Sequence, residues 1–244
     1  MKLYFMMGLP TETYEDLDAI THMGKKILKM GREHAGRRAN LTVSVSVHVP
    51  KPHTPFQWCA MDTLPQIDEK QAFLRKQAKS GRLNLRTHSS DGALIECVLA
   101  RADRKVAEAV FLAYKNGCRF DGWDEHFKFD IWLDAFKEAG VDIDQYTGTI
   151  PVEGRLPWDH LDVGLEDGFL AMEYKRSMKG RYSPPCSKPF GGAVNLGKKV
   201  DKEHRTSGGH HTNIADHDKD ERRLVCYDCG VACDLDLMRD ERRD

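Results

Sequence analysis

The feature that most constrains the fold is a strand–loop–helix unit that begins at the second residue. After Lys2, residues 3–7 are apolar or aromatic, which suits a strand buried on both faces of a parallel sheet. Gly8 and Pro10 then break the strand, and Thr13 lies three residues before Asp16, as in a helix cap. The apolar residues that follow recur with helical spacing, and the segment ends in basic side chains.

A second unit of the same kind follows. Residues 42–49 alternate four valines with Thr42, Ser44, Ser46 and His48, and a proline-rich loop comes next. In a parallel barrel both faces of a strand are covered, so the polar side would face the lumen. The alternative is an antiparallel edge strand with a solvated polar face. In the barrel case the proline loop lies at the strand's carboxyl end, where such barrels carry their active sites.

Together these units predict an α/β fold that contains the closing half of a parallel barrel. Helices are expected near 65–80, 91–117, 124–139 and 166–179. We assign residues 1–82 to the barrel, 83–186 to a helical extension, 187–223 to a flexible polar linker and 224–244 to a cysteine-rich tail.

The composition of the chain argues against several functional classes. The 244 residues carry 37 basic and 38 acidic side chains, so a global electrostatic grip on nucleic acid is not supported. No apolar stretch is long enough to span a bilayer, and the first residues do not resemble a signal peptide. We therefore expect a cytoplasmic protein, in which seven cysteines serve as thiols or metal ligands.

The cysteines near the end of the chain form the strongest chemical pattern. Cys226, Cys229 and Cys233 lie within eight residues, and Gly230 allows a tight turn around an ion. Cys186, held by the two prolines before it, is the preferred fourth ligand. The alternative ligands are His210, His211 and His217, and the alternative to a metal site is a solvated tail with incidental cysteines. Zinc and an iron–sulfur cluster both suit four thiolates. The isolated Cys59, Cys97 and Cys118 are expected to be buried apolar residues.

Several segments resemble the radical S-adenosylmethionine (radical SAM) superfamily. Residues 5–13 (FMMGLPTET) look like its fifth-strand motif, and residues 49–56 (VPKPHTPF) look like its sixth-strand exit. Residues 94–104, 120–123 and 156–160 and the terminal cysteines resemble a subgroup of unknown reaction that carries a B12-binding domain before the barrel.

The resemblance implies reductive cleavage of S-adenosylmethionine to a 5′-deoxyadenosyl radical by a [4Fe-4S] enzyme, with cobalamin as a further cofactor. It places Gly8, Leu9 and Pro10 near S-adenosylmethionine, and Val49 and Pro50 near its adenine end. No side chain matches a catalytic acid, base or nucleophile of the family. By position alone, His48, His53 and Glu12 are further candidates to line the site.

The departures from the family pattern qualify that expectation. The Cys-x3-Cys-x2-Cys loop that holds the catalytic cluster is absent, and the terminal cysteines have the reverse spacing. The B12-binding domain and the first four barrel strands are also missing. We therefore expect a C-terminal portion that is inactive alone and whose partner is the missing barrel half, on the same or a separate polypeptide.

Two other functional classes stay open. A metal-stabilised scaffold, held by Cys186 and the three terminal cysteines, could complement a separately encoded barrel half. A nucleic-acid-binding zinc knuckle has only the local charges of 219–223 and 239–243 in its favour.

Overall fold

The computed structural model describes residues 1–183, 186, 224, 226, 229–231 and 233–241. The chain divides into two compact units, Met1–Leu161 and Asp162–Asp244. The first unit contains both the segment assigned to the barrel and most of the predicted helical extension. Each unit is described by itself.

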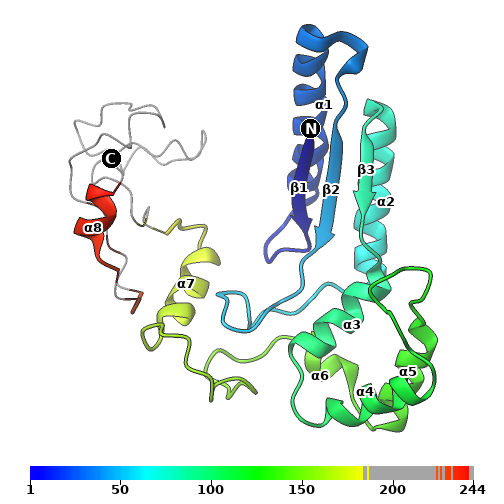
Figure 1. Ribbon diagram of the computed structural model, residues 1–244, viewed down its shortest axis with the longest axis vertical. Helices are drawn as coiled ribbons and strands as arrows, with labels where there is room; N and C mark the ends of the chain where they lie inside the picture. The colour runs from blue at the N-terminus through cyan, green and yellow to red at the C-terminus, as the bar shows by residue number, and fades with distance from the viewer. Residues whose placement is uncertain (184–185, 187–223, 225, 227–228, 232, 242–244) are drawn as a thin grey trace. The chain divides into compact units, whose positions relative to one another are not determined.

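The first unit is built on a parallel sheet of three strands (Figure 1). The strands are β1 (Lys2–Met7), β2 (Thr42–Val47) and β3 (Asn84–Thr87), and they lie side by side in chain order. Phe5 pairs with Val45, which in turn pairs with Thr87. The parallel pairing confirms the predicted α/β class. It also shows that the antiparallel edge-strand alternative for 42–49 is wrong, since β2 is central.

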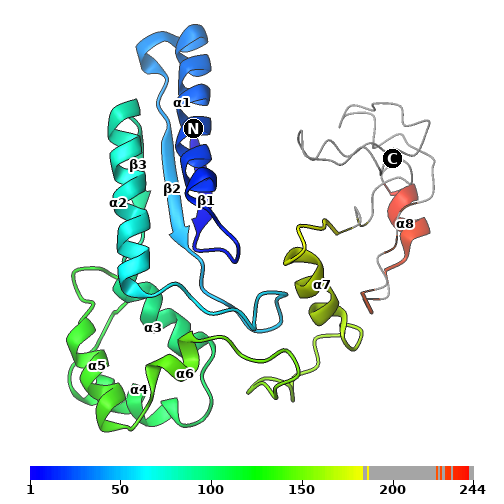
Figure 2. The same cartoon turned by 180° about the vertical axis from the view of Figure 1, so that it is seen from behind.

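Two long helices cover the same face of this sheet. Both α1 (Tyr14–Ala35) and α2 (Leu64–Gly81) lie behind the strands in Figure 1 and in front of them in Figure 2. The valines of β2 face these helices and form one apolar core with Leu17, Ile67 and Leu74. A short 3-10 turn, η1 (Gly36–Arg38), follows α1. Because both crossovers pass over one face, the other face of the sheet has no helix over it within this unit.

The expectation that the first strand is buried on both faces is therefore wrong for this unit. Tyr4 and Met6 are 70% and 46% exposed, whereas Met7 is buried. The uncovered face also carries Ser44 and Arg86, which lie in register with Tyr4. Because residues 3–7 are all apolar or aromatic, the sequence does not show that only alternate residues of this strand contact the helices.

The remainder of the first unit is helical. It consists of α3 (Ser90–Ala100), α4 (Val106–Lys115), α5 (Phe129–Glu138) and α6 (Ile143–Thr147), whose apolar residues form a second core around Trp132 and Phe136. The single helix predicted over 91–117 is interrupted between Ala100 and Val106. The chain turns there because Arg101 bonds to carbonyls outside the helix and Asp103 accepts a hydrogen bond from the Lys105 N–H. The helix expected at 124–139 begins only at Phe129, after a turn in which Phe120 has a φ of 60°.

The second unit contains α7 (Phe169–Ser177) and α8 (Leu235–Asp240). The predicted helix near 166–179 is confirmed, and Gly180 follows it with a positive φ. The proposed linker 187–223 lies outside the described residues. Within the part of the chain that the structure describes, no helix is both long and apolar enough to cross a membrane.

Candidate functional site

The candidate site lies at the carboxyl ends of β1 and β2. The turn after β1 is fixed by Gly8, whose φ is +84° and whose N–H donates to both carboxylate oxygens of Glu12, at 2.9 and 3.0 Å. A side chain at position 8 would not fit, because a Cβ there would lie 2.9 Å from the Asp62 carboxylate. The sequence thus places a glycine where the chain must both turn and accept a close neighbour.

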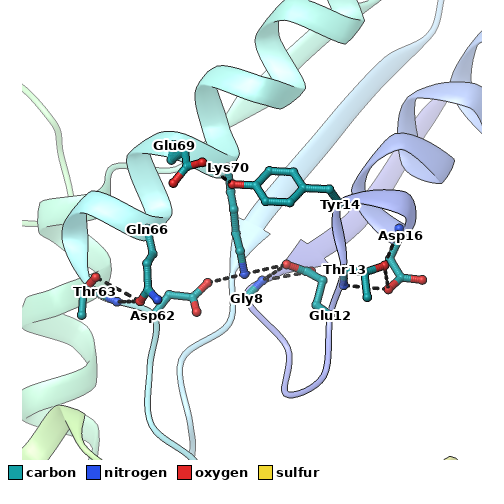
Figure 3. A network of polar contacts seen from close by, with 10 residues as sticks. All are labelled: Gly8, Glu12, Thr13, Tyr14, Asp16, Asp62, Thr63, Gln66, Glu69 and Lys70. Carbon is teal, nitrogen blue, oxygen red and sulfur yellow. Dashed lines mark hydrogen bonds and ion pairs between the residues drawn. The ribbon is translucent and has the colours of Figure 1, made fainter.

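An ion-pair cluster holds this turn against the start of α2 (Figure 3). The Lys70 ammonium lies 2.9 Å from Glu12 and 2.7 Å from Asp62, and all three side chains are largely buried. Burial by itself lowers the pKa of Lys70, but the hydrogen bonds to Asp62 and Glu12 outweigh it and raise that pKa above its ordinary value. Lys70 therefore remains an ammonium at neutral pH, so the cluster positions the turn and supplies no general base.

Local contacts also fix the start of α1. Thr13 and Asp16 form the expected capping box, in which the Thr13 N–H and hydroxyl both donate to the Asp16 carboxylate. The Tyr14 hydroxyl donates to Glu69 at 2.7 Å and its ring packs edge-on against Phe73. The loop is thereby joined to α2 by a second contact, close to the ion-pair cluster in Figure 3.

The residues after β2 form the other side of the candidate site. The His48 N–H donates to the Met7 carbonyl at 2.7 Å. The two chain segments therefore stay paired beyond the end of β2. Its imidazole is buried and packs edge-on against Phe56. Burial lowers the pKa of His48, and the charge of Asp62 and a hydrogen bond to the Gly8 backbone oppose that effect only in part. His48 is thus neutral at neutral pH, and its Nδ1 has no hydrogen-bond partner among the described residues.

The proline loop is tied to a distant segment. His53 has a φ of 55°, and its N–H donates to the Gln57 side-chain oxygen at 2.9 Å. The same oxygen accepts from the Trp158 indole at 2.8 Å, so residues 156–160 brace the loop. The His53 Nε2 is buried without a partner in the described part of the chain. Two buried imidazole nitrogens at this end of the sheet thus have no hydrogen-bond partner among the described residues.

The five predicted cofactor-contacting residues lie on these two loops. Gly8 is buried, with its N–H already bonded to Glu12, so it can contribute shape but no donor. Leu9 and Pro10 are half-buried and present surface, whereas Val49 and Pro50 are buried. Sequence reasoning singled out Glu12, His48 and His53 but missed Asp62, Lys70 and Gln57. No local pattern could have identified these three, because each acts on a residue from another segment.

The cysteines divide into two groups. Cys59, Cys97 and Cys118 are buried, as predicted. Cys186, Cys226 and Cys233 are exposed and Cys229 is half-buried. The described residues contain no group of three or more His, Cys, Asp or Glu side chains arranged to hold a metal ion. His210, His211 and His217 lie outside the described residues. The four-cysteine metal site stays a prediction.

The backbone around Cys229 is nevertheless well anchored. Its carbonyl accepts from the Glu166 N–H at 2.8 Å, and Gly230 follows with a φ of +93°. A Cβ on Gly230 would lie 2.4 Å from the Glu166 nitrogen, so only glycine allows this approach. The turn expected at Gly230 is thus present.

Comparison with known proteins gives one similarity. The uncharacterized protein MJ0966 of Methanocaldococcus jannaschii is 27% identical over 141 residues, which are 58% of this chain and 30% of that protein. This chain therefore matches less than a third of the length of that relative. No family model matches the chain, and no solved structure matches it significantly.

Proposed function

We propose that this chain supplies late strands of a radical SAM barrel to an enzyme that cleaves S-adenosylmethionine reductively. The observation that carries the proposal is the single-sided sheet, with three parallel strands in chain order and both crossover helices on one face. In a barrel every helix lies outside and the strands follow one another in chain order, as they do in this sheet; one βαβαβ half of a doubly wound sheet has the same arrangement. The resemblance of residues 5–13 and 49–56 to late strands of the radical SAM barrel is what favours the barrel.

The uncovered face supports the same proposal. In a barrel it would line the lumen, and it carries Ser44, Ser46 and Arg86 beside the more apolar Tyr4 and Met6. His48 continues the alternation of Ser44 and Ser46 along the chain. Its unpartnered Nδ1 is then a candidate contact at the mouth of the barrel, where sites of this fold lie.

The residues of this chain have limited roles in such an enzyme. Leu9 and Pro10 present surface to S-adenosylmethionine, and the buried Gly8, Val49 and Pro50 shape the loops around it. The sequence has no Cys-x3-Cys-x2-Cys loop, so the residues present do not fit the catalytic [4Fe-4S] cluster. That cluster, and any cobalamin, would be held by the other part of the barrel enzyme.

The test is reconstitution. The chain is combined anaerobically with a polypeptide that provides the other strands and a cluster loaded on the Cys-x3-Cys-x2-Cys loop, and 5′-deoxyadenosine is measured after addition of dithionite. We expect product only when both polypeptides are present. Leu9→Asp should lower the rate about tenfold or more, because it sets a charge against the cofactor. Val110→Asp, on the exposed side of α4, is the control. A loaded cluster with no product, or a rate indifferent to this chain, refutes the proposal.

A second candidate, the metal-stabilised scaffold, is favoured by the anchored turn at Cys229 and Gly230. In it Cys186, Cys226, Cys229 and Cys233 would hold one zinc ion or iron–sulfur cluster. Purified chain should then contain about one metal site per molecule, which Cys229→Ser removes and Cys118→Ser, at a buried position, does not. Full metal content in Cys229→Ser would exclude this site.

A further inference from the structure

A cleft of about 650 Å³ lies in the helical part of the first unit. Its walls come from the end of α3, from α6 and from the loop that follows α6. The charged and polar lining residues that matter here are Arg101, Asp103, Asp144, Arg155, Asp159 and His160. The cleft thus joins the turn after α3 to residues 155–160.

Arg101 is an unusual residue for the base of such a cleft. Its side chain is 1% exposed, and its Nη1 donates to the carbonyls of Cys59 and Gly148, at 3.1 and 2.9 Å. Its Nε and Nη2 are also buried but have no hydrogen-bond partner in the described part of the chain. These two nitrogens form one edge of the guanidinium, with parallel N–H groups that match the two oxygens of a carboxylate.

The charge of Arg101 is also uncompensated. No ion pair joins it to a carboxylate of the described residues, whose salt bridges lie elsewhere. Burial lowers the pKa of Arg101, and the charge of Cys97, a hydrogen bond with its thiol and the charge of Cys59 oppose that effect, but a guanidinium stays charged in proteins. Burying a charged guanidinium whose Nε and Nη2 donors lack a partner costs folding free energy unless an anion pairs with it.

We propose that this cleft binds a small carboxylate of the amino-acid zwitterion type, which reaches the Nε–Nη2 edge of Arg101 by displacing the groups that cover both nitrogens in the unliganded chain. The ammonium group of the proposed ligand is inferred from the charges that line the cleft. Asp103, Asp144 and Asp159 outnumber Arg101 and Arg155, so the lining disfavours a polyanion and suits a ligand that also carries an ammonium group. Asp103 and Asp159 are fixed in place by the Tyr146 hydroxyl at 3.0 Å and the Leu156 N–H at 2.7 Å. This site is independent of the radical SAM proposal.

The test follows the Arg101 Nε–H signal by NMR in the full chain labelled with ¹⁵N-arginine. Arg101→Lys assigns the signal by its loss. Glycine, acetate, methylammonium and inorganic phosphate are titrated in turn. We expect glycine and acetate to move the signal and methylammonium to leave it in place. Glycine should bind about two- to fivefold more tightly than acetate, the margin expected from exposed ion pairs.

Two variants keep the test decisive if Arg101→Lys does not fold. Asp144→Asn alters an exposed carboxylate of the rim and should reduce the preference for glycine over acetate. Arg155→Gln alters the exposed arginine of the rim and should leave the Arg101 signal responsive to glycine. If no probe moves the signal in the folded wild-type chain, the site is refuted. If phosphate binds as tightly as glycine, the assignment to a zwitterion is wrong.

Discussion

At the scale of single residues, Gly8 controls the geometry of the candidate site. Gly8→Ala should lower the free energy of unfolding by about 2–4 kcal/mol, because it adds both a strained left-handed φ and a clash with Asp62. Gly140→Ala is the control, since Gly140 has a φ of +66° but nothing within 4 Å of a Cβ. It should cost only the backbone strain, about 1–2 kcal/mol. Urea denaturation measures both, and equal losses would contradict the proposed clash.

His48 should make stability depend on pH. Because burial lowers its folded pKa below the ordinary value of 6.5, the unfolded chain takes up a proton first as the pH falls. The stability that neutral His48 contributes is therefore present above about pH 6.5 and is lost as the pH falls below it. Between about pH 7.5 and about pH 5.5, His48→Gln should lose less stability than wild type. The exposed His22→Gln should follow wild type. Parallel pH curves for wild type and His48→Gln would show that His48 is not the titrating group.

At the scale of elements, the contact of α1 with the sheet depends on Gly24. A Cβ there would lie 3.0 Å from Val43 and 3.1 Å from Leu83, so Gly24→Val should overpack this contact and cost about 1–3 kcal/mol. In the same helix, Gly31 has only Ala39 nearby, at 3.4 Å. Gly31→Ala should therefore stabilise by about 0.5–1 kcal/mol. Thermal and urea unfolding test both, and a neutral Gly24→Val would mean that the helix can move away from the sheet.

Lys70 joins two elements that are distant in sequence. Lys70→Met leaves Glu12 and Asp62 without their cation and should cost about 1–3 kcal/mol, a range that allows for partial solvent exposure. Since the folded pKa of Lys70 is above its ordinary 10.5, the difference from wild type should persist at neutral pH and shrink in strong alkali. Lys76→Met, exposed on the same helix, should change stability by less than about 0.5 kcal/mol. Equal effects of the two variants would show that the ion-pair cluster does not stabilise the fold.

Local patterns predicted the elements better than the contacts between them. The alternation of 42–49, the glycine turn at Gly8 and the Thr13 cap each depend on neighbouring residues, and each lies where expected. The break between α3 and α4 was missed because Arg101 bonds to carbonyls of Cys59 and Gly148, which are far away in sequence. The short β3 and α6 were missed as well, since neither carries a long periodic pattern. The site follows the same rule, because Lys70 acts on residues of two other segments.

At the scale of the whole molecule, the uncovered face of the sheet should govern association. In the first unit that face exposes Tyr4 and Met6, and β1 pairs with no described strand other than β2. Exposed apolar faces and unpaired strand edges favour contact between chains. We therefore expect light scattering after gel filtration to give a mass above 27.8 kDa that rises with protein concentration.

Two variants distinguish association through the uncovered face of the sheet from association through other parts of the surface. Met6→Lys should lower the apparent mass, because it places a charge on the uncovered face beside the unpaired edge. Met30→Lys should leave the mass unchanged, although Met30 on α1 is 52% exposed and Met6 46%. A polypeptide that completes the barrel should suppress association of the wild-type chain, since it would cover both the edge and the face. A monodisperse chain of 27.8 kDa that melts cooperatively by itself would show that this face needs no partner, and would count against the barrel proposal.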